Sequence, residues 1–215
     1  IVRIISLIFR SILGLFKIEK KVIERYIRNY FKSKPKFIKN NLLAVSKGYH
    51  IGKLYSSKIT IQVKKDKKIA KELYMDGSEA IALGAIAGGC NFISSYPMSP
   101  STGVLVNMAK HGKNFDVLVE QVEDEIAAIN MSLGAWYAGA RGLVTTSGGG
   151  FDLMTEGLSL SGMIETPLVV HIAQRSGPAT GLPTRTEQGD LDLAIYAGHG
   201  EYPRVVLAPG DAEEA

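Results

Sequence analysis

Apolar residues follow two different spacings along this chain, one in its first part and another in the rest. In residues 20–31 and 36–48 they recur every three or four positions, which predicts two helices joined as a hairpin across residues 33–35. Residues 59–63 alternate between apolar and polar, which predicts a strand, and residues 64–71 read as a charged linker. The first part of the chain is therefore expected to be a small, mainly helical segment.

The second part alternates short apolar runs with helical stretches rich in glycine and alanine. This alternation predicts an α/β domain, a parallel sheet with helices on both faces. Ligands of such sheets bind beyond the carboxyl ends of the strands, so the segments after these strands are the candidate site. The predicted strands are 92–96, 117–119, 143–146, 168–173 and 205–208, and the predicted helices are 77–89, 102–110, 124–140 and 151–163.

Charge divides the chain at a similar place. Residues 1–75 carry 19 Lys and Arg against 4 Asp and Glu, whereas residues 76–215 carry 6 and 17. We interpret the change as a domain boundary. The basic part could bind nucleic acid, but its lysines lie on all helix faces without a recognition-helix or stacking pattern, which favours a solvated surface and no nucleic acid partner.

The composition argues against disulfides, iron–sulfur clusters, metal sites and a membrane-spanning helix in this chain. A single cysteine, Cys90, rules out a disulfide framework or an iron–sulfur cluster held by this chain alone, and is expected to be a small buried packing residue. Four histidines without a metal-binding spacing argue against a protein metal site. The apolar residues 1–17 are interrupted by Arg3 and Arg10, which argues against a membrane-spanning helix. Both ends of the chain read as cut, the last residues resembling the start of a helix.

The segment from Tyr96 to Thr102 is the most informative, because two prolines frame a row of hydroxyls before a predicted helix. Ser99 suits an N-cap, and Pro100 suits the first turn. The helix would then direct its free N–H groups at an anion held by Ser99, Ser101 and Thr102. An ordinary capped turn without a ligand is the alternative, and the segment alone does not decide between them.

Glu125 is the candidate catalytic group. Glu123 and Asp124 before it are explained by the positive end of a helix, but Glu125 continues into a mostly apolar stripe that should pack inward. Burial would raise its pKa and let it share a proton with a ligand nitrogen; a solvent-facing Glu125 in a structural subunit is the alternative. The loop 145–150 could bring backbone N–H groups to a ligand, but it lacks the lysine of a P-loop.

Two arginines follow the predicted strand at 168–173. The planar guanidinium suits a carboxylate, and we expect Arg175 to clamp one and Arg185 to be structural. The alternative is a salt bridge to Glu187 or Asp190.

Five segments together resemble the alpha subunit of 2-oxoacid:ferredoxin oxidoreductases, and the resemblance extends over nearly all of residues 72–215 in order. The run Gly-Pro-Ala-Thr-Gly-Leu-Pro-Thr is most similar to the branch acting on 2-oxoglutarate. The resemblance implies a tail of a gamma-type domain at 1–50, a linker with a short strand at 51–74 and a pyrimidine-binding domain at 75–215. The five segments are Gly77–Ala80, Tyr96–Thr102, Glu123–Gly139, Thr146–Gly148 and Gln174–Gln188.

The resemblance also implies roles for single residues around thiamine diphosphate. Glu125 matches the glutamate that bonds the pyrimidine ring of this cofactor, and Arg175 matches the arginine on the substrate carboxylate. Ser99 matches the hydroxyl beside that carboxylate, and Thr184 lies near the distal end of the substrate. The remaining residues implied to contact the cofactor are Tyr96, Pro97 and Ser147.

The activity implied is oxidative decarboxylation of a 2-oxoacid, pyruvate or preferably 2-oxoglutarate, to acyl-coenzyme A, with electrons passed to ferredoxin. Nothing in the sequence resembles the diphosphate and magnesium motif or the cluster cysteines. We therefore expect Mg²⁺ and an iron–sulfur cluster on a beta subunit, in a cytoplasmic alpha–beta heteromer that dimerises, with this chain inactive alone. The alternatives are a thiamine-dependent domain of the transketolase type, disfavoured by the loop 174–184, and a non-catalytic basic binding module.

Overall fold

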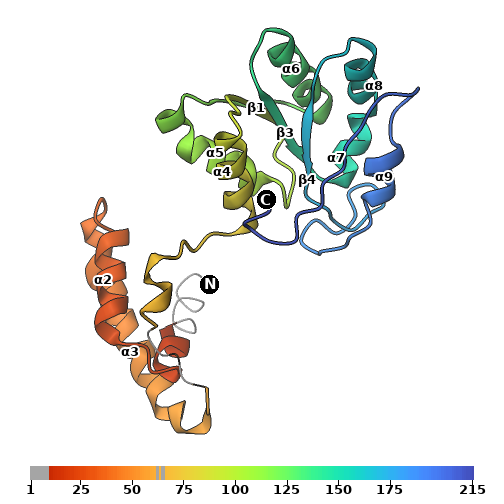
Figure 1. Ribbon diagram of the computed structural model, residues 1–215. Coiled ribbons are helices and arrows are strands. Elements are labelled where there is room, and N and C mark those ends of the chain that lie inside the picture. The colour runs from red at the N-terminus through yellow and green to blue at the C-terminus, as the bar shows by residue number, and fades with distance from the viewer. Residues whose placement is uncertain (1–9, 62, 64–65) are drawn as a thin grey trace. The chain divides into compact units, whose positions relative to one another are not determined.

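The computed structural model describes residues 10–61, 63 and 66–215. It divides into two compact units, the first ending at Glu72 and the second running from Leu73 to Ala215 (Figure 1). The division lies close to the change of charge after residue 75. Each unit has its own packing and is described by itself.

Two antiparallel helices build the N-terminal unit, as the apolar spacing predicted (Figure 1). Ile23 and Val45 are buried between them. The second helix continues well past the predicted end at residue 48. The elements are α2 (Lys20–Tyr30), η1 (Pro35–Phe37), α3 (Ile38–Tyr55), η2 (Ser56–Lys58) and η3 (Lys68–Lys71), and residues 10–15 are also helical.

Glycines explain why α3 runs further than its apolar pattern indicates. A Cβ on Gly52 would lie 1.8 Å from the carbonyl oxygen of Ser11, and a Cβ on Gly14 would lie 2.1 Å from that of Tyr49. The backbones of α3 and of the helix at 10–15 therefore touch, and only glycine allows this approach. Their contact stabilises the additional turns of α3.

The predicted strand at 59–63 is wrong for the residues that the structure describes there. Residues 59–61 and 63 lie outside any helix or strand, and this unit offers no neighbouring strand within its described residues. Alternation alone cannot make a strand without a partner for its N–H and C=O groups.

The apolar residues 1–17, which Arg3 and Arg10 interrupt, are described from residue 10 onward, so Arg3 lies outside the described residues. Among the helices described, none is long and apolar enough to cross a membrane.

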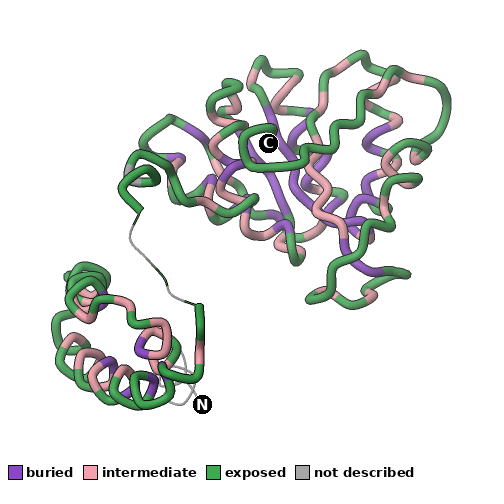
Figure 2. The backbone as a smooth tube through the Cα atoms, turned by 60° about the horizontal axis from the view of Figure 1, so that its bottom comes forward, coloured by how far each residue is buried: buried purple, intermediate pink, exposed green. Residues whose placement is uncertain are grey.

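A four-stranded parallel sheet forms the centre of the C-terminal unit, in the order β2-β1-β3-β4. Figure 2 shows the buried strands at the middle of the unit. All residues of the two central strands are buried, as expected for a parallel sheet covered on both faces. The hydroxyls of Ser94 and Ser95 on β1 donate hydrogen bonds to backbone carbonyls, which allows them to be buried. The strands are β1 (Phe92–Ser95), β2 (Leu118–Gln121), β3 (Gly142–Thr146) and β4 (Val169–Ile172).

Helices cover both faces of the sheet, as the alternating pattern predicted. Ile93 and Leu143 pack with α4 and α5 on one face, and Val144 packs with α6, α7 and α8 on the other. Cys90 packs against the first core, half-buried, and its burial raises the pKa of the thiol. The helices are α4 (Gly77–Ala87), α5 (Thr102–Phe115), α6 (Glu125–Tyr137), α7 (Gly148–Leu153), α8 (Thr155–Met163) and α9 (Leu191–Tyr196).

Three local predictions fail in this unit. The predicted fifth strand is absent, since residues 205–208 lie outside any helix or strand, with Val205 83% and Leu207 82% exposed. The helix predicted at 151–163 begins earlier, at Gly148, and is divided at Met154, while α9 was not predicted. The acidic end from Asp211, expected to begin a helix, forms turns. Residues 205–208 find no partner strand in the described part of the chain, and the turns after Asp211 are held by hydrogen bonds between near neighbours.

Candidate functional site

The carboxyl ends of all four strands lie at one edge of the sheet, because the strands are parallel. Four of the predicted site residues follow these ends. Ser99 comes after β1, Glu125 after β2, Ser147 after β3 and Arg175 after β4. This edge is therefore where the structure brings the candidate residues together.

Glu125 is the first residue of α6 and is buried, with 3% of its surface exposed. The preceding residue, Asp124, caps the helix by accepting a hydrogen bond of 2.7 Å from the N–H of Ala127. Ala128 and Ile129 on the predicted apolar stripe are fully buried, so the stripe packs inward as predicted. The alternative in which Glu125 faces solvent is wrong.

The carboxyl of Glu125 has an unusual electrostatic environment. Its Oε1 is buried and has no hydrogen-bond partner in the described part of the chain. Burial raises the pKa of Glu125 above its usual value, and the nearby charge of Asp124 raises it further. A hydrogen bond with its own backbone and the charge of Arg175 act in the opposite direction. The group is thus suited to hold or share a proton.

Glycine at position 150 makes room for this carboxyl. A Cβ there would lie 2.1 Å from Oγ1 of Thr146 and 2.7 Å from Oε1 of Glu125. The predicted glycine loop at 145–150 is wrong in its extent, since β3 continues to Thr146 and α7 starts at Gly148. Only Ser147 joins them, and its hydroxyl is buried without a partner among the described residues. The start of α7 is thus packed directly against Glu125.

Arg175 is held at the end of β4 with 7% of its surface exposed. Its NH1 donates a hydrogen bond of 2.9 Å to the backbone carbonyl of Ser99, and its Nε is buried without a partner in the described chain. Asp190, considered above as a salt-bridge partner for an arginine, instead accepts a bond of 3.3 Å from the backbone N–H of Arg175. Arg185 is exposed.

The start of α5 differs from the prediction. The helix begins at Thr102 with Ser101 as its N-cap residue, so Ser99 is not the cap and Pro100 is not in the first turn; the Ser99–Pro100 bond is cis. Ser101 is fully buried, and its hydroxyl donates a hydrogen bond of 2.6 Å to the backbone carbonyl of Met98. It is committed to this turn, and the anion-cap hypothesis loses one of its three hydroxyls.

The remaining predicted site residues lie at the rim. Tyr96 and Ser99 are exposed and Pro97 is half-buried, all just after β1. Thr184 lies on an exposed turn, and its predicted role stays a prediction. Sequence reasoning missed the close packing of Gly150 and the bond made by Asp190. Three consecutive glycines at the start of a helix were the available signal for the first.

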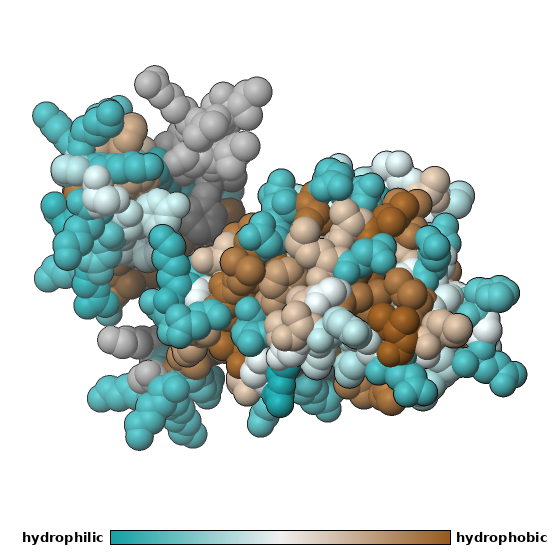
Figure 3. Space-filling model, turned by 90° about the horizontal axis from the view of Figure 1, so that it is seen from above, coloured by the Kyte–Doolittle hydropathy of each residue, from teal (hydrophilic) through white to brown (hydrophobic). Residues whose placement is uncertain are grey.

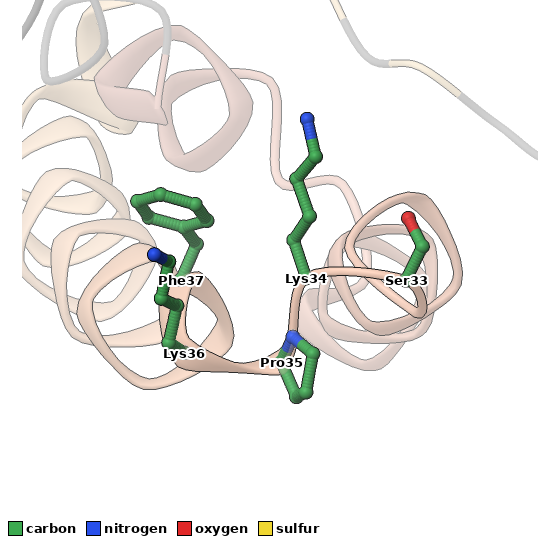
Figure 4. A pocket seen from close by; sticks show the side chains of 5 residues that line it. All are labelled: Ser33, Lys34, Pro35, Lys36 and Phe37. Carbon is green, nitrogen blue, oxygen red and sulfur yellow. The ribbon is translucent and has the colours of Figure 1, made fainter.

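A hollow lies in the N-terminal unit, at the turn between α2 and α3 (Figure 4). It is open and lined by the five residues from Ser33 to Phe37. The Nζ atom of Lys36 lies 5.3 Å from the ring centre of Phe37. The rings of Tyr26 and Tyr30 on α2 stack with their centres 5.9 Å apart. Neither contact was predicted from the sequence. Nothing in this hollow matches the buried, unpartnered groups at the sheet edge. In the described ranges, no cluster of His, Cys, Asp and Glu could hold a metal ion.

Comparison with known families decides which kind of protein this is. The model of the pyruvate flavodoxin/ferredoxin oxidoreductase family, thiamine diphosphate-binding, matches residues 83–215. The chain belongs to this family. The thiamine diphosphate-binding domain of the family thus covers the whole sheet and the candidate site.

Curated subunits of 2-oxoacid and 2-oxoglutarate oxidoreductases are similar in sequence to the chain. The 2-oxoacid:ferredoxin oxidoreductase 1 subunit alpha of Sulfurisphaera tokodaii is 43% identical over 189 residues, which cover 82% of this chain and 29% of that protein. The 2-oxoglutarate oxidoreductase subunit KorA of Mycobacterium tuberculosis is 40% identical over 193 residues, covering 86% and 29%. The chain spans about a third of such relatives or less.

A solved structure resembles nearly the entire chain. It is the 2-oxoglutarate:ferredoxin oxidoreductase from Magnetococcus marinus with 2-oxoglutarate, coenzyme A and succinyl-CoA bound. It is 38% identical, with a TM-score of 0.82, and the match covers 97% of this chain and 37% of that one. The match therefore includes the N-terminal unit.

The sheet edge fits the cofactor of this thiamine diphosphate-binding family. Three buried polar atoms there lack partners in the described chain, namely Oε1 of Glu125, Oγ of Ser147 and Nε of Arg175. Buried polar groups are almost always hydrogen-bonded, so such atoms mark a place for a polar ligand. A carboxyl with a raised pKa is a suitable partner for a ring nitrogen, because it can share a proton with it.

Proposed function

We propose that this chain is part of the alpha subunit of a thiamine diphosphate-dependent 2-oxoacid:ferredoxin oxidoreductase and supplies its pyrimidine-binding domain. The observation that carries the proposal is the buried carboxyl of Glu125, with an unpartnered Oε1 at the carboxyl edge of the sheet. Such a site is where a family member would hold the aminopyrimidine ring. Tyr96, Pro97 and Ser147 would line the same place.

The role of Glu125 follows from its environment. Because burial raises its pKa, Oε1 can donate or share a proton with a pyrimidine nitrogen at a pH where an exposed glutamate is ionised. Bound thiamine diphosphate supplies the electron-accepting chemistry that removes carbon dioxide from a 2-oxoacid. The part of this chain is to orient the ring and to fix the proton. The carboxyl is buried against Gly150 of α7, which would keep water away from its bond to the ring.

The proposed partner of Arg175 is the substrate carboxylate. Its NH1 is already fastened to the carbonyl of Ser99, which holds the guanidinium plane, while Nε remains to be paired. Bonds between a guanidinium and a carboxylate are strong in places shielded from water. Ser99 would add its hydroxyl beside that carboxylate, and Thr184 would lie near the distal end of a dicarboxylic substrate. The bound 2-oxoglutarate of the similar structure makes 2-oxoglutarate the favoured substrate.

The proposal extends to partners. We assign the Mg²⁺ site and an iron–sulfur cluster to a beta subunit, and ferredoxin and coenzyme A to the assembled, dimerised cytoplasmic complex. Apolar side chains exposed on α6 and α8 support a protein partner, since exposed apolar patches are typical of interfaces; Figure 3 views the side of the unit on which these helices lie. We further assign residues 1–50 to the tail of a gamma-type domain and 51–74 to the linker. The exposed apolar side chains are Ile126 and Met131 on α6, Leu160 and Met163 on α8, and Ile164 directly after α8.

The test uses the assembled enzyme with variants of the full-length subunit. Glu125→Ala is expected to abolish decarboxylation, with the exposed Glu123→Ala as its control. Arg175→Ala is expected to raise KM for 2-oxoglutarate about tenfold or more, the effect of losing a bond to a charged group, with Arg185→Ala as its control. Pyruvate should be the poorer substrate of the unmodified enzyme. Near-normal turnover in both site variants would refute the proposal.

A further inference from the structure

Asp190 stands at the start of α9 but does not act as a helix cap. An aspartate at this position normally accepts a hydrogen bond from the N–H groups of the first turn. Here its side chain makes no such bond. Its carboxylate is instead directed to the end of β4, where Oδ2 accepts a hydrogen bond of 3.3 Å from the backbone N–H of Arg175.

A second hydrogen bond joins the same two segments in the opposite direction. The backbone N–H of Asp190 donates a hydrogen bond of 3.0 Å to Oε1 of Gln174, the residue before Arg175. The two bonds close the base of the loop 176–189, most of which is exposed. Arg175 is therefore fastened through its backbone at the point where the loop begins.

The same carboxylate also lies against the first glycine of α7. A Cβ on Gly148 would be 2.1 Å from Oδ1 of Asp190, so only glycine leaves space for it. The second glycine touches the loop as well, since a Cβ on Gly149 would be 2.9 Å from the carbonyl of Ala179. The third glycine, Gly150, faces Glu125. One turn of helix thus separates the loop of Arg175 from the carboxyl of Glu125.

We propose that Asp190 is a positioning residue for Arg175, which it sets at a defined distance from Glu125 by fastening the loop base to the glycine turn of α7. The inference rests on the proposed function of Arg175 as the group that binds the substrate carboxylate. Asp190 itself touches no substrate in this account. Its loss should therefore weaken binding of the 2-oxoacid and leave the later steps nearly unchanged.

The experiment measures kcat and KM for 2-oxoglutarate in the assembled enzyme. Asp190→Ala is expected to raise KM about tenfold, as for a lost bond to a charged group, with kcat changed by less than about twofold. Asp190→Asn keeps an oxygen that accepts from the N–H of Arg175, so its KM should stay within about threefold of the parent. Asp192→Ala, an exposed aspartate on the first turn of α9, is the matched control.

Gly148→Ala provides an independent route to the same defect, because its Cβ would displace the Asp190 carboxylate. Its KM should rise like that of Asp190→Ala, and the double variant should be no worse than Asp190→Ala alone, since both changes act through one contact. Tryptic cleavage after the exposed Arg185 is a readout separate from activity. A loosened loop base should speed this cleavage several-fold in Asp190→Ala but not in Asp192→Ala, while thermal unfolding checks that the variant is folded.

The outcomes separate this inference from the proposed function. If Arg175→Ala raises KM but Asp190→Ala and Gly148→Ala leave KM and the cleavage rate unchanged, the positioning role is wrong and the proposed function stands. If Arg175→Ala leaves KM unchanged, the inference is wrong together with the proposed role of Arg175 on which it rests, and Glu125→Ala then decides whether the rest of the proposed function stands. Additive effects in the double variant would also overturn the inference.

Discussion

Replacing Glu125 by Gln tests directly whether the carboxyl is desolvated. Burial raises the pKa of Glu125 above its usual 4.5, so at a pH between the usual and the raised pKa the folded chain binds a proton that the unfolded chain has already lost. Stability conferred by that proton is complete below the usual pKa and is lost as pH rises through the raised pKa. Gln does not titrate. The variant should therefore be more stable than the parent near neutral pH, and the difference should vanish in acid.

The structure sets the size of the expected effect. The side chain is 3% exposed and its Oε1 has no partner in the described chain, while the charge of Arg175 offsets part of the cost of ionisation. An unsatisfied buried polar group costs about 1 to 3 kcal/mol, and the amide of Gln keeps part of that cost. We expect Glu125→Gln to gain about 1.5 kcal/mol near neutral pH. For a chain of this size, that is about 3 to 6 °C in Tm.

Thermal unfolding of the subunit without cofactor, followed between about pH 4 and pH 8, is the assay. Glu123→Gln is the matched control, because Glu123 is exposed two residues earlier and should change stability by less than about 0.5 kcal/mol. The reasoning is refuted if Glu125→Gln gives no gain near neutral pH. It is equally refuted if the gain is the same in acid, because the effect would then have no connection with ionisation.

Substitutions at Gly150 and Asp124 probe the surroundings of Glu125. Gly150→Ala should destabilise the subunit by about 1 to 3 kcal/mol in thermal unfolding, since the added Cβ has no room beside Thr146 and Glu125. The control is Gly134→Ala, which has open space on α6 and should stabilise the subunit by about 0.5 to 1 kcal/mol. Equal effects of the two substitutions would contradict the close packing at Gly150. Asp124→Ala should cost about 1 kcal/mol through loss of the α6 cap, and Asp124→Asn should not. Both Asp124 variants should lower the pKa of Glu125 and shrink the gain from Glu125→Gln, and an unchanged gain would show that the charge of Asp124 has no influence.

Much of the fold could be predicted because local spacing reports burial. The strands β1 and β3 are buried along their whole length, and the apolar residues that they contain were enough to predict both. Residues 205–208 are more apolar than either strand, yet they stay exposed without a partner strand in the described chain. A strand needs a neighbour to bond its backbone, and composition does not say whether one is present.

The candidate site divides in the same way. The inward direction of Glu125 was predictable, because residues three and four positions further along α6 define the buried face. The bond from Arg175 to Ser99 joins residues 76 positions apart, and the place of Asp190 depends on the space above Gly148. No local pattern contains such pairs. The roles given to Ser99, Thr184 and the residues of the cofactor site stay predictions until the variants are measured.

The sequence by itself determined the two helices of the N-terminal unit, the four paired strands, the buried face of α6 and the change of character near residue 75, since helical and strand spacing follow from the geometry of the backbone. It also determined which chemical groups follow each strand. Only the tertiary structure decided that Gly148, Gly149 and Gly150 begin a helix, and that this turn lies between the loop of Arg175 and the carboxyl of Glu125. The physical reason is packing, because close contact between distant segments depends on shape and space that become defined when the chain has folded.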